Sequence, residues 1–324
     1  MVSQGEIDAF VELGYCAVRE AFSPEVARRC RRAVWKHIEQ QGITEEDPST
    51  WSRAPKGRLG LAEIFRDSDL GAPWSECWSP RLREAIDQVC GAGKWEPNGC
   101  GWWVVTFPED NAEPWGVRGN WHVDGHGYRH LAQSREVGLV LLMLFSDVGP
   151  NGGGTALAPN SHRVVAEKLL RAGADGLAGP ALSAATRAAV DLDNPVEARG
   201  RAGDVFLLHP FLLHARSKNL SGHVVRFLCH PVLALREPLR LFPRPADPTP
   251  VERVALDVLD HLPPPHVLPS PPPPGGDSPR LPPRDNTIAA VMGFDAFARQ
   301  RSGNLRARKK RKSRRPSRPS SEKR

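Results

Sequence analysis

The sequence has few cysteines, and no two of them are closely spaced. The six are scattered over 324 residues, at Cys16, Cys30, Cys77, Cys90, Cys100 and Cys229. This pattern matches neither a disulfide framework nor a zinc site built on paired cysteines. It is typical of a protein from a reducing compartment.

Long apolar runs are also missing. The longest, VGLVLLMLF at residues 137–145, is too short to cross a bilayer. The N-terminal segment MVSQGEIDAF contains early acidic residues and lacks the apolar stretch of an export signal. We therefore expect no membrane span and a cytoplasmic location.

Positive charge is concentrated at the C-terminus. Residues 301–324 carry twelve Lys or Arg and one acid, Glu322, so the chain's net charge of +7 leaves −4 on residues 1–300. The tail has two interpretations. It binds nucleic acid or an acidic partner, or acts as a nuclear signal if the source is eukaryotic. Alternatively it is a solvated extension, because it lacks aromatic residues for base stacking.

Proline marks the end of the predicted folded body. Residues 1–262 contain most of the apolar side chains and form the predicted domain. Residues 263–285, PPPHVLPSPPPPGGDSPRLPPRD, are too rich in proline to form a core, so we predict a linker that makes few contacts with the body. Residues 286–324 are predicted to be a short helix, at 286–300, and a disordered basic tail.

The body begins with a helix at 3–14 and a strand at 15–22. A second helix at 23–42 has Ser23 as N-cap and Pro24 at its first position. Further helices are expected near 163–172 and 181–190. Short apolar runs separated by turns predict an α+β fold with a mainly β core, an antiparallel sandwich or jelly roll with helices outside. These runs lie at 102–107, 120–125, 137–145, 154–159, 204–209 and 224–233.

The segment WHVDG predicts part of a metal site. On a strand, His122 and Asp124 point to the same face, where an imidazole and a carboxylate can bind one metal. By itself the pair is equally well explained as hydrogen-bonded surface residues. A third ligand is available in residues 203–227, where His209 and His214 compete. Two histidines and one carboxylate form the facial triad of non-haem Fe(II) oxygenases, which leaves three coordination positions open.

Arg226 predicts an anionic ligand near this site. It lies within the apolar strand VVRFLC, where an arginine is costly to bury without an anionic partner. 2-Oxoglutarate would occupy two open metal positions through its keto oxygen and near carboxylate. The planar guanidinium suits its far carboxylate. A purely structural ion pair is the alternative.

These segments together resemble the phytanoyl-CoA dioxygenase family of Fe(II)/2-oxoglutarate-dependent oxygenases. The matching stretches are WHVDGH at 121–126, NGGGTALAPNSHR at 151–163 and GDVFLLHPFLLHARSKNLSGHVVR at 203–226. In APNSH, Asn160 replaces a glycine that is common in the family and can adopt the same left-handed backbone. The resemblance spans roughly residues 5 to 260.

The resemblance implies a double-stranded β-helix of the cupin-like jelly-roll type. It implies Fe(II) ligands at His122, Asp124 and His214, and 2-oxoglutarate bound by Arg226, with Ser217 contacting the same cosubstrate. His162 then belongs to a turn. Thr106 and Trp103 are weaker candidates for cosubstrate contacts.

The implied activity is the use of O2 to oxidise a C–H bond of a small molecule, with release of succinate and CO2. Halogenating relatives lack the carboxylate, so Asp124 favours hydroxylation, desaturation or cyclisation. The alternative is a catalytically silent binding protein that uses the same fold and its basic tail.

Overall fold

The computed structural model describes residues 1–54, 58–61, 72–96, 102–109, 114–125, 127–262 and 277–279. All of them belong to a unit that spans Met1–Leu281. The predicted helix at 286–300, the basic tail and most of the predicted linker lie outside the described residues. None of the helices in the described part of the chain combines the length and apolar character needed to span a lipid bilayer.

The N-terminal helices form where their capping residues predict them. Ser3 and Glu6 make a reciprocal capping box at the start of α1, and Gly14, with φ of +88°, ends it. Ser23 caps α2 by accepting a hydrogen bond from the Val26 amide, with Pro24 at the first helical position. The described helices are α1 Gln4–Leu13, α2 Pro24–Ile38, α3 Pro80–Cys90, α4 Ser161–Ala172, α5 Gly179–Arg187 and α6 Pro250–His261, with short 3₁₀ turns at Glu39–Gln41, Pro48–Arg53, Trp74–Cys77 and Gly173–Asp175.

The strands form one large and one small antiparallel sheet, with an additional short β5–β8 pair. The large sheet has the order β1-β10-β6-β12-β4-β2, and β13 pairs with both β6 and β3; the small sheet has the order β11-β7-β9. The strands are β1 Tyr15–Val18, β2 Arg58–Leu61, β3 Trp95–Glu96, β4 Trp102–Thr106, β5 Arg129–His130, β6 Leu139–Leu144, β7 Ala156–Leu157, β8 Leu177–Ala178, β9 Val196–Glu197, β10 Val205–Leu208, β11 His214–Ala215, β12 Arg226–His230 and β13 Val232–Leu235.

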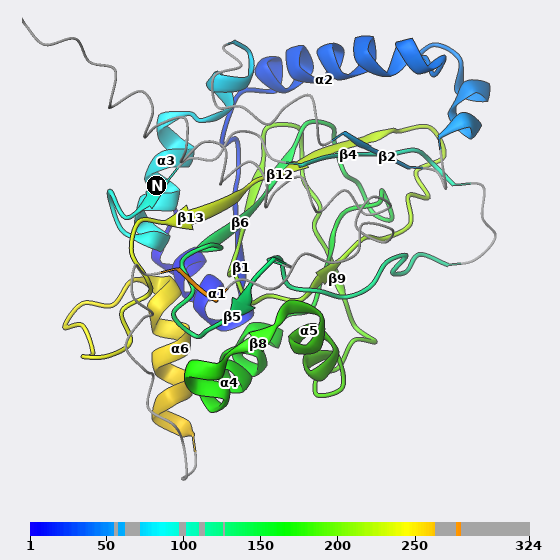
Figure 1. The fold of residues 1–324 in the computed structure, drawn as a ribbon. Coiled ribbons are helices and arrows are strands. Elements are labelled where there is room, and N and C mark those ends of the chain that lie inside the picture. The colour runs from blue at the N-terminus through cyan, green and yellow to red at the C-terminus, as the bar shows by residue number, and fades with distance from the viewer. Residues whose placement is uncertain are drawn as a thin grey trace, which may run out of the picture. The chain divides into compact units, whose positions relative to one another are not determined.

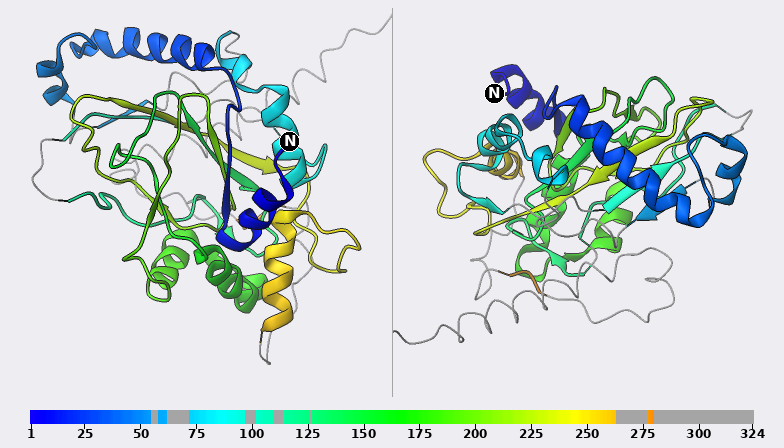
Figure 2. Two further views of the ribbon diagram at one scale, coloured as in Figure 1. Left: turned by 180° about the vertical axis from the view of Figure 1, so that it is seen from behind. Right: turned by 90° about the horizontal axis from the view of Figure 1, so that it is seen from above.

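Helices lie outside the two sheets (Figures 1 and 2). Apolar side chains from both sheets pack between them as an interior core. Alternate residues of β6 divide between the two faces: Leu141 and Met143 pack under α2 and α3, whereas Leu142 and Leu144 face the small sheet. Helices α4 and α6 cover the outer face of the small sheet, where Ala156 and Ala215 lie. This is the predicted α+β jelly roll, a double-stranded β-helix with flanking helices.

One predicted strand is wrong. Residues 120–125 form no regular strand, and only His122 makes an isolated antiparallel bridge, to His214. The next amide, Val123 N, donates to the Ser183 hydroxyl of α5 at 3.3 Å instead of to a strand. Gly125 then turns the chain with φ of +101°. A helix therefore supplies the hydrogen bond that a neighbouring strand would have supplied.

The predicted linker contacts the body at Asp277–Pro279. The buried carboxylate of Glu136 accepts hydrogen bonds from Ser278 N at 2.6 Å and Ser278 Oγ at 2.9 Å. Arg135 pairs with Asp277, and Arg129 N donates to the Pro279 carbonyl at 2.8 Å. The linker segment therefore contacts the body at these three residues, where it supplies hydrogen-bond donors to a buried carboxylate.

We expect two truncations to differ in stability. A chain ending at Leu281 keeps the Ser278 contacts and should match the full chain. A chain ending at Leu262 leaves Glu136 without its two donors, which should lower the free energy of unfolding by about 1–3 kcal/mol. Urea unfolding of the three chains measures this, and equal midpoints for the two truncations would show that the Ser278 contacts contribute nothing.

Candidate metal centre

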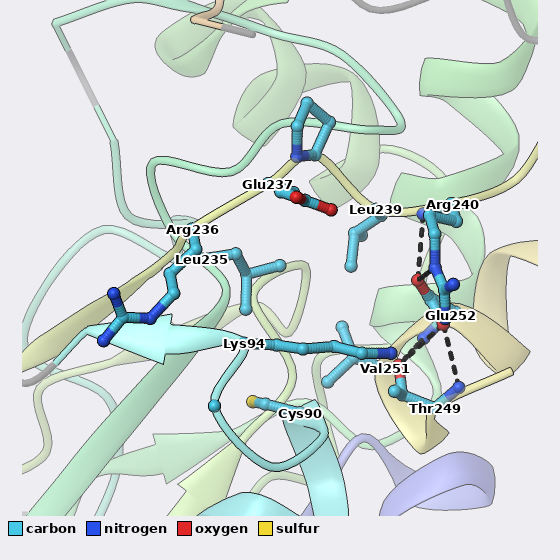
Figure 3. Close-up of a pocket in the computed structure, with 12 residues that line it drawn as sticks. Cys90, Lys94, Leu235, Arg236, Glu237, Leu239, Arg240, Thr249, Val251 and Glu252 are labelled. Carbon is cyan, nitrogen blue, oxygen red and sulfur yellow. Dashed lines mark hydrogen bonds and ion pairs between the residues drawn. The ribbon is translucent and has the colours of Figure 1, made fainter.

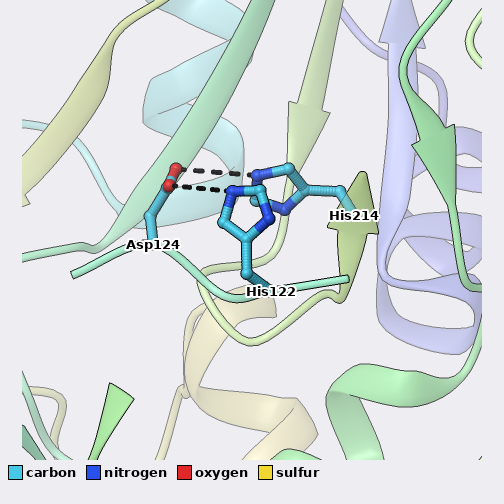
Figure 4. Close-up of side chains that lie close together, drawn as sticks. All are labelled: His122, Asp124 and His214. Atoms are coloured by element: carbon cyan, nitrogen blue, oxygen red, sulfur yellow. Dashed lines mark ion pairs between the residues drawn. The ribbon is translucent and has the colours of Figure 1, made fainter. Parts of the chain in front are cut away.

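Two histidines and one aspartate meet in the interior between the sheets. His214 in β11 lies directly opposite Leu157 of β7, which packs in the interior core, so His214 also faces inward. His122 is held beside it by backbone hydrogen bonds of 3.1 and 3.0 Å between the two residues. Asp124 directs its carboxylate at both rings, with Oδ1 3.8 Å from His122 Nε2 and Oδ2 3.8 Å from His214 Nε2 (Figure 4). We call His122, Asp124 and His214 the triad.

The backbone sets the tautomer of both triad histidines. Nδ1 of His122 lies 2.9 Å from the Asn120 carbonyl, and Nδ1 of His214 lies 3.0 Å from the Leu212 carbonyl. A carbonyl oxygen only accepts, so each Nδ1 carries the proton and donates it. In the neutral form of each ring, Nε2 then presents a lone pair toward Asp124. In metal-binding histidines, the ring nitrogen that does not bind the metal commonly donates its N–H to a backbone carbonyl.

This donor set fits a divalent cation. The three ligand atoms lie within 4.8 Å of one another. Two lone pairs facing a carboxylate repel one another unless a cation lies between them. In addition, His214 Nε2 is buried and makes no hydrogen bond with any described residue. Two neutral imidazoles and one carboxylate are the ligands that non-haem Fe(II) takes in a facial triad.

Burial keeps His214 neutral. Loss of solvation, reinforced by His122, lowers the pKa of His214 to about 3, and the negative charge of Asp124 only partly opposes this. A metal needs the unprotonated imidazole, so at neutral pH His214 requires no deprotonation before it binds.

Arg226 lies on the same interior as the triad. It begins β12, where Leu228 packs in the interior core while Phe227 and Cys229 face the opposite side, so Arg226 points inward by alternation. Its side chain is buried and donates from Nη2 to the Thr106 hydroxyl at 2.6 Å. That bond orients the guanidinium within the interior.

The other residues predicted to contact the cosubstrate, Ser217, Thr106 and Trp103, differ in their surroundings. Ser217 is buried on the segment that follows β11, and its hydroxyl donates to the Gly154 carbonyl at 2.6 Å. Its proton must turn away from Gly154 before it can reach a carboxylate. Thr106 lies opposite Arg226 in the β4–β12 register, whereas Trp103 packs in the outer core, against the other face of the large sheet. Thr106 is therefore the better of the two predicted contacts.

The sequence interpretation missed His230. It ends β12 on the same face as Arg226 and places Nε2 3.6 Å from Asp124 Oδ2. Its ring lies 5.8 Å from the His214 ring, and burial lowers its pKa. The signal was present in VVRFLCHPVL, because residues two and four positions after Arg226 share its face in a strand.

Other histidines have structural roles. His209, the competing ligand candidate, is buried under α6, with Nε2 3.2 Å from the Val251 carbonyl. His162 is the second residue of α4, which follows the Asn160 turn, where Asn160 has φ of +66° as predicted. His130 bonds through Nε2 to the Gly125 carbonyl at 2.7 Å. His126 lies outside the described residues.

His162 makes acid stability a testable property. Its Nε2 donates to the Val11 carbonyl at 3.1 Å, and burial lowers its pKa to about 4. The unfolded chain, with a pKa near 6.5, is protonated first as the pH falls, so this contribution to stability is present above pH 6.5 and is lost toward pH 4. The loss amounts to about 3 kcal/mol.

We expect His162→Gln to reduce this pH dependence, because the amide still donates to Val11 but does not titrate. Urea unfolding of metal-free protein at pH 7 and pH 4.5 measures the difference. Equal losses in the wild-type protein and the variant would contradict this role for His162.

The cavity in Figure 3 is separate from the triad. Its lining comes from the end of α3, the chain after β13 and the start of α6, and shares no residue with the triad or with β12. Its buried acid, Glu252, is already engaged by the Thr249 cap and by Arg240. The cavity therefore offers no site for the chemistry of the triad.

Comparison with known proteins gives one family match. The family model described as phytanoyl-CoA dioxygenase (PhyH) matches residues 10–227. That range includes the triad, Ser217 and Arg226, whereas His230 lies beyond it. Comparison with curated proteins gave no match.

Several solved structures are similar in fold. The epimerase SnoN, crystallised with Fe3+, alpha ketoglutarate and nogalamycin RO, has 16% identity and a TM-score of 0.48, over 86% of this chain and 95% of its own. HygX from Streptomyces hygroscopicus, with nickel and 2-oxoglutarate bound, has 14% identity and a TM-score of 0.43, over 72% and 87%. EctD from S. alaskensis, in its apoform, has 18% identity and a TM-score of 0.45, over 74% and 81%.

Proposed function

Because this chain belongs to the phytanoyl-CoA dioxygenase family, we propose that it is an Fe(II)/2-oxoglutarate-dependent dioxygenase. Its substrate is a small organic molecule with a C–H bond that becomes oxidised. In the hydroxylation form of the reaction, one oxygen atom of O2 enters the product and the other enters succinate, while 2-oxoglutarate loses CO2. The substrate and 2-oxoglutarate each give up two electrons, and O2 takes up all four.

One observation carries the proposal: two Nε2 lone pairs and a carboxylate converge in the interior of a jelly roll. A structural metal site would be closed by four protein ligands, whereas a catalytic centre keeps positions open. The described residues bring three candidate ligands within 4.8 Å of one another. Three ligands leave room for a bidentate cosubstrate and O2.

Each residue has a distinct role. His122, Asp124 and His214 would hold Fe(II), which when bound supplies the activation of O2 coupled to decarboxylation of 2-oxoglutarate. Arg226 would bind the far carboxylate of 2-oxoglutarate with its planar fork, oriented by Thr106. The buried side chains of Leu142, Leu144 and Leu228 exclude water from the same interior.

Formation of succinate tests the proposal. Purified protein is incubated with 2-oxoglutarate, O2 and Fe(II), with or without a chelator, and succinate is quantified by mass spectrometry. We expect formation that requires Fe(II) and is absent in Asp124→Ala. Binding of both Fe(II) and 2-oxoglutarate with no succinate, even across a broad panel of small-molecule substrates, would favour the catalytically silent binding protein.

A further inference from the structure

Three histidines surround Asp124. His122 Nε2 approaches Oδ1, while Oδ2 lies 3.8 Å from His214 Nε2 and 3.6 Å from His230 Nε2. The third ring comes from a different sheet: His214 belongs to the small sheet and His230 to the large one. Asp124 is therefore contacted from both sides of the interior.

The three rings are of two kinds, distinguished by what lies beside Nδ1. In His122 and His214 a backbone carbonyl accepts from Nδ1, which leaves Nε2 as a lone pair. Nδ1 of His230 is buried and makes no hydrogen bond with any residue that the structure describes. A neutral imidazole has one N–H, and for His230 the acceptor within reach is the carboxylate at Nε2. His230 therefore presents an N–H at Nε2, whereas His122 and His214 present a lone pair at Nε2.

We propose that His230 is a positioning residue, whose Nε2–H holds Oδ2 of Asp124 so that Asp124 binds the metal through Oδ1 alone. This inference rests on the proposed function, because it concerns the same metal centre. The distance of 3.6 Å is longer than a hydrogen bond, so the proposed bond requires the two side chains to rotate toward each other. The strand itself is fixed, since β12 is paired on both edges, with β4 and β6.

One-oxygen binding by Asp124 has a chemical consequence. A carboxylate that binds through both oxygens takes up a coordination position that a bidentate cosubstrate and O2 need. His230 therefore keeps positions open without binding the metal itself. Groups that orient a metal ligand in this way typically contribute about 10- to 100-fold to metal affinity.

Two substitutions separate the effect of the His230 N–H donor from the effect of its side-chain volume. His230→Gln keeps an N–H at a position close to Nε2, whereas His230→Leu keeps bulk and removes the donor. His261→Leu is the control, because His261 is exposed on the last turn of α6 and bonds only locally, to the Asp257 carbonyl. Co(II) dissociation constants are measured by calorimetry, with melting temperatures of the metal-free proteins as a check on folding. Pulsed electron paramagnetic resonance of Cu(II)-loaded protein counts bound imidazoles.

We expect His230→Leu to raise the Co(II) dissociation constant about 10- to 100-fold, and His230→Gln to stay within about threefold of the wild-type protein. The wild-type protein and His230→Leu should both show two bound imidazoles. Unchanged affinity in His230→Leu, or equal loss in the two variants, would overturn the proposal. Three bound imidazoles in the wild-type protein would make His230 a ligand and overturn it too. A wild-type protein that binds no metal would instead contradict the proposed function, and this inference with it.

Discussion

In the His214→Ala protein we expect metal binding to be lost while the fold is retained. The substitution removes a neutral imidazole whose Nε2 is buried and makes no hydrogen bond with any described residue, so few other interactions depend on it. The metal loses one of three protein ligands. The loss should exceed the roughly 10- to 100-fold that substitution of an orienting neighbour costs. We expect Asp124→Ala to behave in the same way.

The control is His209→Gln, five residues earlier in the same apolar segment. His209 bonds to the Val251 carbonyl, and the glutamine amide can still donate there. We expect this variant to bind Co(II) with wild-type affinity, even if its melting temperature falls. Anaerobic calorimetry with Fe(II) or Co(II) distinguishes the two histidines. If His214→Ala bound the metal normally and His209→Gln did not, His209 would be the metal ligand and our assignment of His214 would be wrong.

The second large effect concerns Arg226. If its guanidinium binds the far carboxylate of 2-oxoglutarate, Arg226→Ala should weaken the affinity for 2-oxoglutarate by about 2–5 kcal/mol, or roughly 30- to 5000-fold. The affinity for the metal should change much less, because Arg226 contributes no ligand atom. Separate titrations of metal and cosubstrate measure the two effects.

Related variants test the geometry of this contact. Arg226→Lys should recover only part of the affinity, since an ammonium cannot reproduce the planar fork. Thr106→Val removes the hydroxyl that accepts from Arg226 and should weaken 2-oxoglutarate binding modestly, by about 1 kcal/mol. Unchanged 2-oxoglutarate affinity in Arg226→Ala would mean that a different cation holds the cosubstrate.

Local signals in the sequence predict the parts of the fold that local interactions decide. Helices α1 and α2 begin at Ser3 and Ser23 because each serine accepts a hydrogen bond from a helix amide, and such caps are visible in the sequence. The start of α6 has the same kind of signal, Thr249 with Glu252 three residues after it, and a reader of the sequence could have found it.

Tertiary packing decides what the sequence cannot predict. Residue types and order were enough to select His122 and Asp124 as ligand candidates, whereas the choice of His214 over His209 came from the family resemblance. That Val123 N bonds to Ser183 of α5 instead of to a strand depends on how a distant helix docks. The approach of His230 to Asp124 likewise depends on the spacing between two sheets, although its place on the Arg226 face follows from strand periodicity.

Anaerobic titration of the Fe(II)-loaded protein with 2-oxoglutarate, followed by visible absorption, tests the central claim most directly. A keto acid that chelates Fe(II) produces a charge-transfer band. We predict that this band appears with one equivalent of 2-oxoglutarate in the wild-type protein, requires much more in Arg226→Ala, and is absent in His214→Ala. A wild-type protein that binds Fe(II) but shows no band at any concentration of 2-oxoglutarate would contradict the account.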